Sequence, residues 1–400
     1  MRAGSLIIAV LLVLGPSAVG SGQPVVRPSG EVRLERRGGL PELAGTLQSM
    51  DERGVLLESR RLGERLIPWD RVRRLHGVSD PRLDQWLEDG TRIWRARIRI
   101  GRGDPLSAEP LLEPLFERFV GRTDELALVV VEGLLRCRIA RGANDLAVVP
   151  MLETIRMRDA GVASPAYASL PPVIDEVRGL VPAVPPAWHA GADRSALAAR
   201  LGEARRRLEQ GRPPEGAAPT PRTAAAGRAA DIAAWYLAAA RADEDGEVRP
   251  PTTAVGDDPG LRLLAEVLLG PDALADADAE TAAEATPPDP RAILEASAPA
   301  PTEPAWTADW RDLFAGRRAV RADATADREA GVLRLLRPAA LRPAERPYLA
   351  GLGLARAADV LDRMGRPEEA AILRADLAAR FPGHPERPAG SSGSPEVPLP

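Results

Sequence analysis

Few residues of this chain have a type and a spacing that could support chemistry. The 400 residues include one cysteine, Cys137, and three histidines, His76, His189 and His384, which lie far apart in the sequence. No lysine occurs, so all 53 cationic side chains are arginines. An internal disulfide, a cysteine-rich zinc site and any chemistry that needs a lysine are therefore excluded. We expect no cofactor and no catalytic centre.

Two sets of arginines are the strongest candidates for a binding site. The stretch Arg97–Gly103 reads Arg-Ile-Arg-Ile-Gly-Arg-Gly, and Arg136–Gly142 repeats its pattern 39 residues later. If the two units stack, their arginines would lie on similar faces of successive helices and could line a groove for an anionic ligand. The alternative is that they are solvated or pair with nearby acids such as Glu109 and Asp145. The six candidates are Arg97, Arg99, Arg102, Arg136, Arg138 and Arg141.

Other polar clusters favour structural interpretations. His189 and Asp193 have the spacing of two ligands on one helix face, but the prolines and glycine around His189 indicate a loop. The acidic runs at 243–247 and 272–284 lack the glycine and ligand register of a calcium-binding loop. Three tryptophans are expected to pack in the core: Trp69, Trp306 and Trp310.

Cys137 occupies the position of Ile98 in the arginine-rich repeat. A reactive thiolate needs a basic or helix-start environment, whereas a position shared with isoleucine is typical of a small core side chain. We therefore expect Cys137 to be buried and unreactive.

The N-terminal part of the chain predicts a small β-sheet. Short segments of alternating apolar and polar residues, separated by glycine-containing turns, lie at 31–35, 43–47, 55–58, 66–69 and 72–75. Their order resembles small five-stranded barrels of the SH3-like or Sm-like kind. The resemblance implies a closed, strongly bent barrel over residues 30–77.

Helices are expected from residue 82 onwards. Trp94 to Ile100 alternate in a way that also suits a strand, but the second copy of the repeat lies in a helical run at 125–141, which favours helix. In each copy a glycine that can end a helix, Gly103 or Gly142, is followed five residues later by an alanine. We expect such pairs to be helix hairpins in which the alanine allows close packing.

The segment from Ala357 to Pro382 resembles a tetratricopeptide repeat. Gly365, Ala370 and Pro382 match that family's loop glycine, small second-helix residue and terminal proline, whereas Leu361 stands near positions where the family has aromatic residues. The resemblance implies an array of helix hairpins that binds a partner on one face. The fold class expected is therefore mainly α, with a tetratricopeptide-like hairpin array preceded by a small β-barrel.

The expected organisation follows the prolines and the acidic stretches. Helix-hairpin repeats cover 82–160, and a helical region with proline-rich and acidic linkers covers 161–300. Tetratricopeptide-like helices follow at 305–383, and a disordered tail at 384–400. Further helices are expected at 193–210, 222–242, 260–269, 309–337 and 343–364, with an extended connection over 170–188 and linkers at 212–221 and 286–304.

The N-terminus has the pattern of a secretory signal peptide. Arg2 precedes the apolar run 6–14, Pro16 follows, and small residues allow cleavage near Gly20 or Gly22. The apolar run is too short to span a bilayer, and no second run of that length follows. We therefore expect a signal peptide over 1–20 and a secreted or periplasmic protein without an integral membrane span.

Composition and motifs together favour a non-catalytic role. The net charge of −4 gives no overall indication of nucleic-acid binding. We expect a scaffold that binds a protein partner in the cell envelope, a role implied by the tetratricopeptide resemblance. Two alternatives stay open: an envelope enzyme that uses carboxylates and arginines, and a protein that binds nucleic acid or another anionic polymer through the barrel and the arginine-rich repeats.

Overall fold

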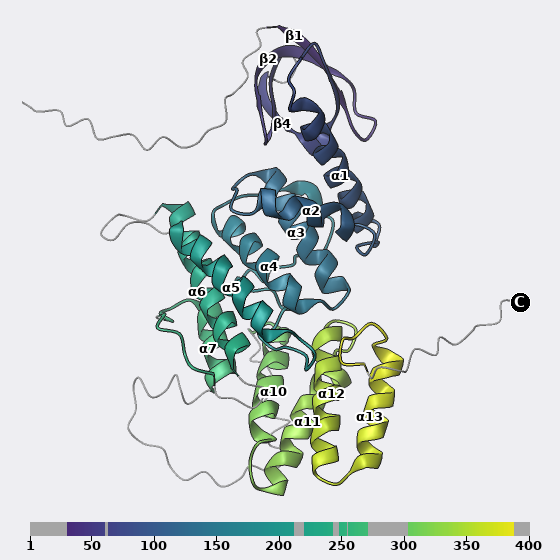
Figure 1. Ribbon diagram of the computed structural model, residues 1–400, viewed down its shortest axis with the longest axis vertical. Coiled ribbons are helices and arrows are strands. Elements are labelled where there is room, and N and C mark those ends of the chain that lie inside the picture. Colours follow the sequence, from purple (N-terminus) through teal and green to yellow (C-terminus); the bar gives the residue numbers. More distant parts are fainter. Residues whose placement is uncertain are drawn as a thin grey trace, which may run out of the picture. The chain divides into compact units, whose positions relative to one another are not determined.

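Figure 1 shows a computed structural model of the chain. The structure describes residues 30–60, 63–211, 220–242, 248–253, 255–270 and 303–387. The predicted signal peptide, both acidic runs and most of the predicted linkers and tail lie outside these residues. The chain divides into two compact units, Met1–Leu87 and Glu88–Pro400. None of the helices described is long and apolar enough to cross a membrane.

The first unit is built on an antiparallel sheet of the five predicted strands. Its order is β4-β3-β2-β1-β5. Alternate side chains of β1 and β3 are buried, as expected for strands with one face on a core. The strands are β1 (Glu31–Arg36), β2 (Leu43–Asp51), β3 (Gly54–Ser59), β4 (Gly63–Pro68) and β5 (Val72–His76).

The closed barrel expected over residues 30–77 is wrong. β4 and β5 are the two edges of the sheet, and no ladder joins them within the described part of this unit. The short 3₁₀ helix η1 (Trp69–Arg71) leads from one edge strand to the other. Register shifts in β1 and β2 disturb the ladders without bringing the edges together. Alternating burial is the same in an open sheet and in a barrel, so the sequence pattern did not distinguish them.

Trp69 lies in the core of this unit, as predicted. Its side chain is 1% exposed and stacks on Trp86, with ring centroids 5.3 Å apart. The indole N–H donates a hydrogen bond to the carbonyl of Asp51 at 2.7 Å. A buried tryptophan therefore keeps its one polar group satisfied.

The second unit is helical, which confirms the mainly α prediction. Residues 94–100 belong to a helix rather than to a strand. The helices are α1 (Leu83–Gly101, which begins in the first unit), α2 (Glu109–Phe119), α3 (Glu125–Ala140), α4 (Asn144–Asp159), α5 (Arg194–Gln210), α6 (Pro221–Arg241), α7 (Pro259–Leu269), α10 (Ala305–Ala319), α11 (Thr325–Leu341), α12 (Pro347–Arg363) and α13 (Pro367–Arg380).

Residues 309–337 form two helices where the sequence predicted one. α10 ends at Ala319, and Ala324 takes an extended backbone conformation with ψ 132° just before α11. Neither glycine nor proline occurs between Arg317 and Thr325, so the sequence carried no signal for this break. The break turns one long element into a pair of helices that pack against each other.

The three repeat glycines end their helices in the way the sequence predicted. Gly103, Gly142 and Gly365 have φ of +79°, +73° and +78°, the left-handed region that glycine enters without strain. The residue after each glycine donates its N–H to a carbonyl five residues earlier; after Gly103, Asp104 donates to Arg99 at 2.9 Å. This pattern is the Schellman motif, which satisfies carbonyls at a helix end.

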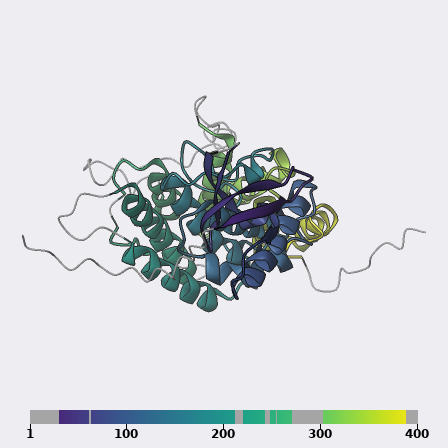
Figure 2. The same cartoon turned by 90° about the horizontal axis from the view of Figure 1, so that it is seen from above.

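Helices that follow one another in sequence pack together. α3 packs with α4, α5 with α6, and α10 to α13 each with the next. Figure 1 shows α10 to α13 side by side, from green to yellow. α4 also packs on α6, and the pairing of the teal helices α5 and α6 is visible in Figure 2 as well.

The connection over 170–188 runs through the second unit without an α-helix, as predicted. Several of its carbonyls accept hydrogen bonds from buried side chains on different helices. Trp310 donates to Pro182 at 3.1 Å, and Tyr236 donates to Val184 at 2.5 Å. Asn144 and Tyr348 donate to the carbonyls of Ala183 and Ala187. A buried loop is tolerated because its backbone polar groups find these partners.

Candidate functional site

The six arginines singled out from the sequence lie near the ends of two helices. Arg97 and Arg99 are on α1, and Arg102 follows it in the loop. Arg99 Nη1 donates to the carbonyl of Ser107 at 2.5 Å, within the loop before α2. This contact joins the end of α1 to the segment that follows it.

The second set of arginines forms ion pairs with carboxylates of the helical unit. Arg141 holds Glu109 with two hydrogen bonds of 2.7 and 2.9 Å. Arg138 is buried and pairs with Glu113 at 3.2 Å. Arg136 pairs with Glu132 at 2.8 Å, one helical turn away. These contacts correspond to the pairing with nearby acids that the sequence left open as the alternative.

A hollow of about 550 Å³ contains one of the six arginines, Arg136. The buried carboxylate of Glu132 lies in its wall and binds Arg136 through one oxygen and Arg158 through the other, at 2.6 Å. Asp159, another lining residue, pairs with Arg228 at 2.9 Å. Two acids of this hollow, Glu132 and Asp159, therefore take part in structural ion pairs.

Cys137 and His189 are placed as predicted. Cys137 is fully buried, and burial raises the pKa of its thiol to about 12, so a thiolate is not formed at neutral pH. His189 lies in a loop, and Asp193 caps α5 by accepting the N–H of Ala196. No cluster of possible metal ligands occurs among the residues described.

Trp306 and Trp310 form a core pair, as predicted. Their rings meet edge to face with centroids 5.0 Å apart, and both are buried. The indole N–H of Trp306 donates to the carboxylate of Asp175 at 3.1 Å. The pair thus fixes α10 against the connecting segment and offers no stacking platform.

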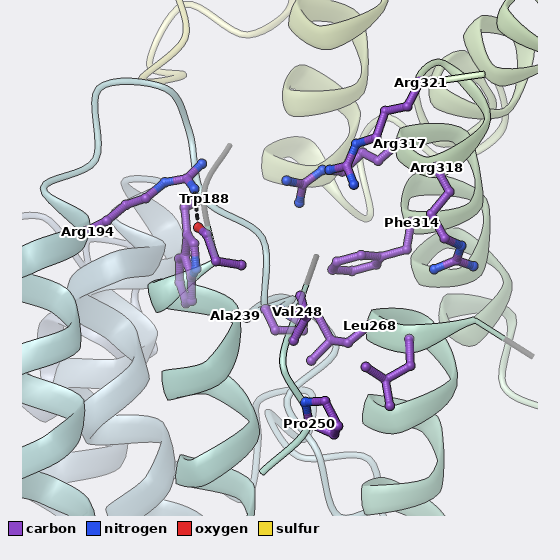
Figure 3. A pocket seen from close by; sticks show the side chains of 13 residues that line it. Trp188, Arg194, Ala239, Val248, Pro250, Leu268, Phe314, Arg317, Arg318 and Arg321 are labelled. Carbon is purple, nitrogen blue, oxygen red and sulfur yellow. Dashed lines mark hydrogen bonds between the residues drawn. The ribbon is translucent and has the colours of Figure 1, made fainter. Parts of the chain in front are cut away.

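A different group of arginines lines a cavity near α10. This cavity, here called the arginine pocket, has a volume of about 350 Å³ and lies between α6, α7 and α10 (Figure 3). Its charged lining residues are Arg194, Arg317, Arg318 and Arg321, and its aromatic ones are Trp188 and Phe314. Aliphatic side chains complete the wall: Pro186, Ala239, Val248, Pro250, Leu268 and Leu269.

Local hydrogen bonds position two of these guanidinium groups. Arg194 Nη1 donates to the carbonyl of Ala242 at 2.8 Å, which ties the start of α5 to the end of α6. Arg318 Nη1 donates to the carbonyl of Val267 at 2.7 Å, in the last turn of α7. A cation at that end of a helix is stabilised by the helix dipole.

Arg317 on α10 and Arg321 in the turn after it extend toward the space in front of Arg194 in Figure 3, whereas Arg318 turns toward α7. The guanidinium of Arg317 lies 5.7 Å from the centre of the Phe314 ring. A guanidinium has five N–H donors in a rigid fork, so it can bind more than one acceptor. The pocket therefore concentrates positive charge beside an apolar wall.

Arg311, earlier on α10, belongs to an ion-pair network. It binds Glu266 and Glu303, each at 2.5 Å, and its hydrogen bond lowers the pKa of Glu303. Arg311 thus holds α10 against α7 and the segment before α10. Arg317 and Arg318 of the pocket follow in the last turn of the same helix.

Trp188 adds a polar group to the pocket. The residue is 2% exposed, and its indole N–H has no hydrogen-bond acceptor among the described residues. A buried donor without an acceptor costs free energy, and this N–H has no accessible surface through which a ligand in the pocket could reach it.

Sequence reasoning missed the arginine pocket. Arg317, Arg318 and Arg321 form a visible basic cluster within one helical turn, but Arg194 and Trp188 are far away in the sequence. No local spacing connects these residues. The packing of α10 against α7 and of α6 against α7 brings them together.

No protein-family model, curated protein or solved structure significantly matches this chain.

Proposed function

We propose that the chain is a non-catalytic scaffold of the cell envelope, secreted or periplasmic, that binds a protein partner. The export-type N-terminus expected from the sequence supports the location. The consecutive helix pairs support a tetratricopeptide-like mode of action, in which packed helices present a rigid binding surface. The arginine pocket is the place on this scaffold where the partner binds.

The observation that carries the proposal is the composition of that pocket. Four arginines share it with an aliphatic wall and two aromatic side chains. Guanidinium groups bind carboxylates through paired hydrogen bonds, and an adjoining apolar wall adds the burial that protein interfaces use. Acidic side chains of a partner protein, flanked by apolar ones, match both properties.

The buried carboxylates favour binding over the alternative of catalysis. Asp309 and Asp312 are almost fully buried, and each binds its own arginine, Arg342 and Arg337. Asp89 is bound by Arg118 through two hydrogen bonds of 2.8 Å. Acid–base catalysis needs a carboxyl group that can exchange a proton with substrate, whereas these groups are neutralised by structural ion pairs.

Photo-crosslinking in the cell envelope tests the proposal. The photoreactive residue p-benzoylphenylalanine replaces Leu269, which lines the pocket, or Leu341, which is 56% exposed on α11. We expect a specific adduct with one envelope protein from position 269 and none from position 341. The adduct should disappear in the double variant R317S/R321S. No adduct from position 269, or one unaffected by the double variant, would overturn the proposal.

A further inference from the structure

The hollow that contains Arg136 is a separate place from the arginine pocket. Its volume is about 550 Å³, and the two share no lining residue. Its wall is formed by α3, the end of α4 and the segment from Ser164 to Gly179, which includes the 3₁₀ helix η2 (Pro165–Tyr167). A volume of this order is typical of sites for small organic ligands. Because arginines and carboxylates both line it, it is here called the mixed-charge hollow.

One group of lining residues carries a net positive charge. Arg136 and Arg158 bind the same buried carboxylate, that of Glu132, at 2.8 and 2.6 Å. One carboxylate neutralises only one of two guanidinium groups, so a single positive charge is left over. Within the part of the chain that the structure describes, Arg158 donates only from Nη2, and its side chain is 37% exposed. Arg158 therefore keeps N–H donors for a ligand carboxylate.

Structural contacts hold this positive group in place. Arg136 Nη2 also donates to the carbonyl of Pro171 at 3.0 Å, and its guanidinium lies 5.4 Å from the centre of the Tyr167 ring. Tyr167 is buried and donates to the carbonyl of Val129 at 3.0 Å. A ligand carboxylate thus meets side chains that are already ordered, which lowers the entropy lost on binding.

Carboxylates supply the opposite charge in the same wall. Glu176 is exposed and forms no ion pair with any of the residues described. Asp159 binds Arg228 at 2.9 Å, but Arg228 also binds Asp258, at 2.6 Å. Two carboxylates share one guanidinium there, so this group carries a net negative charge. Glu176 and Asp159 are therefore partners for a ligand amine.

Apolar side chains complete the wall: Leu170, Pro172, Val173 and Ile174. Val173 and Ile174 are half-buried, so each keeps apolar surface that a ligand can cover. A polyanion would be repelled by Glu176, and no group of possible metal ligands occurs among the residues described. Both signs of charge beside an apolar wall match a small zwitterion with an apolar side chain.

We propose that the mixed-charge hollow binds a small zwitterion of amino-acid chemistry, either an apolar amino acid or a short apolar peptide with free ends. The carboxylate end binds Arg158. The amino end binds Glu176 beside Asp159, and the apolar side chains lie against Val173 and Ile174. This site goes beyond the proposed function, because neither the arginine pocket nor a protein partner takes part in it.

Isothermal titration calorimetry on the full chain tests this inference with leucine and with trileucine. We expect at least one of them to bind, and the tighter of the two shows whether the ligand is an amino acid or a peptide. Acetylation of its amino end, or amidation of its carboxyl end, should weaken binding by about tenfold or more, because a charge-assisted hydrogen bond is lost. Binding of neither compound, or equal binding of the capped forms, would overturn the inference.

Two variants locate the charges of the ligand. R158Q should weaken binding of the free ligand by about tenfold or more but leave that of the amidated form unchanged, because the amidated form has no carboxylate. E176Q should weaken binding of the free ligand in the same way and leave that of the acetylated form unchanged. The matched controls R363Q on α12 and E368Q on α13 make the same charge changes at exposed positions and should have no effect.

The two variants are independent of each other. R158Q removes one of the two partners of Glu132, so circular dichroism and thermal unfolding check its fold. E176Q breaks no ion pair with the residues described, and it tests the site even if R158Q unfolds. A ligand that binds E176Q as tightly as it binds the unaltered chain would overturn the assignment to this hollow.

Discussion

At the scale of single residues, burial determines which groups carry charge. His384 is 7% exposed, its Nε2 lies 2.9 Å from the carbonyl of Tyr348, and its Nδ1 accepts the N–H of Glu386 at 3.1 Å. Both bonds together require a neutral ring. Burial lowers the pKa of His384 to about 4, so the ring is neutral at physiological pH.

This neutral histidine predicts a loss of stability in acid. The unfolded chain takes up the proton near the ordinary pKa of 6.5, whereas the folded chain resists until about pH 4. The contribution is therefore complete above pH 6.5 and is lost as the pH falls toward 4. Between pH 7.5 and 4.5 the unaltered chain should lose about 2 kcal/mol more unfolding free energy than H384Q, measured with urea. Equal losses in both proteins would contradict this assignment.

The buried pair Asp309–Arg342 predicts a strong energetic coupling. Asp309 is fully buried, and Arg342 binds it at 2.7 and 3.0 Å. D309A leaves a guanidinium in a largely buried place and should cost about 3 kcal/mol, whereas D309A/R342A should cost less than the sum of the two single changes. Urea unfolding of the four proteins gives the coupling.

An exposed pair provides the control for that cycle. Arg206 and Glu203 form a contact on the surface of α5, with both side chains more than half exposed. E203A should change the unfolding free energy by less than about 1 kcal/mol. A loss as large as that of D309A would show that burial does not set the strength of these pairs.

At the scale of elements, small residues decide how closely helices approach. A Cβ atom added to Gly353 on α12 would lie 2.1 Å from the carbonyl oxygen of Leu335 on α11. Gly316 on α10 and Gly331 on α11 also lie close together, since a Cβ atom added to Gly316 would lie 2.9 Å from the carbonyl oxygen of Gly331. The row of helices α10 to α13 thus depends on glycines inside helices, where glycine is otherwise unfavourable.

Two alanine substitutions test this packing with opposite expected signs. G353A should destabilise the protein by about 2 kcal/mol, since α11 and α12 must move apart. G202A in α5 meets nothing closer than 3.8 Å and should stabilise by up to about 1 kcal/mol, because alanine favours helix. Thermal unfolding measures both. A neutral G353A would show that the helices do not depend on this close approach.

The elements also show what the sequence could predict and why. Gly103 and Gly142 were assigned as helix ends because the left-handed conformation is a local property of glycine. The role of Gly353 was not foreseen, since it depends on a helix packed against it from another part of the chain. Whether the five strands close into a barrel likewise depends on contacts between β4 and β5. The sequence pattern within each strand does not predict such contacts.

At the scale of the helical unit, a buried connection joins distant helices. The carbonyls of Pro182, Ala183 and Val184 accept hydrogen bonds from side chains on α10, α4 and α6 in turn. This segment leads directly to Pro186 and Trp188 in the wall of the arginine pocket. The sequence predicted the extended connection from its prolines, but not that it is the element around which the pocket is assembled.

The same long-range packing explains why the candidate site in the structure differs from the one that the sequence predicts. The sequence points to the arginines at 97–102 and 136–141 because they repeat, and a repeat can be recognised from the order of residues alone. The structure pairs Arg136, Arg138 and Arg141 with carboxylates. It gathers Arg194 and Arg317 in one pocket, although they are far apart in the sequence.

Hydrogen–deuterium exchange of the full chain with and without the envelope protein crosslinked from position 269 tests the central claim most directly. We predict slower exchange on binding at the start of α5, the ends of α6 and α7, and the last turn of α10, around the arginine pocket. The ends of α1 and α3, which carry the repeated arginines, should not change. Protection at the ends of α1 and α3 without protection at α5 and α10 would contradict the account and return the site to the repeats.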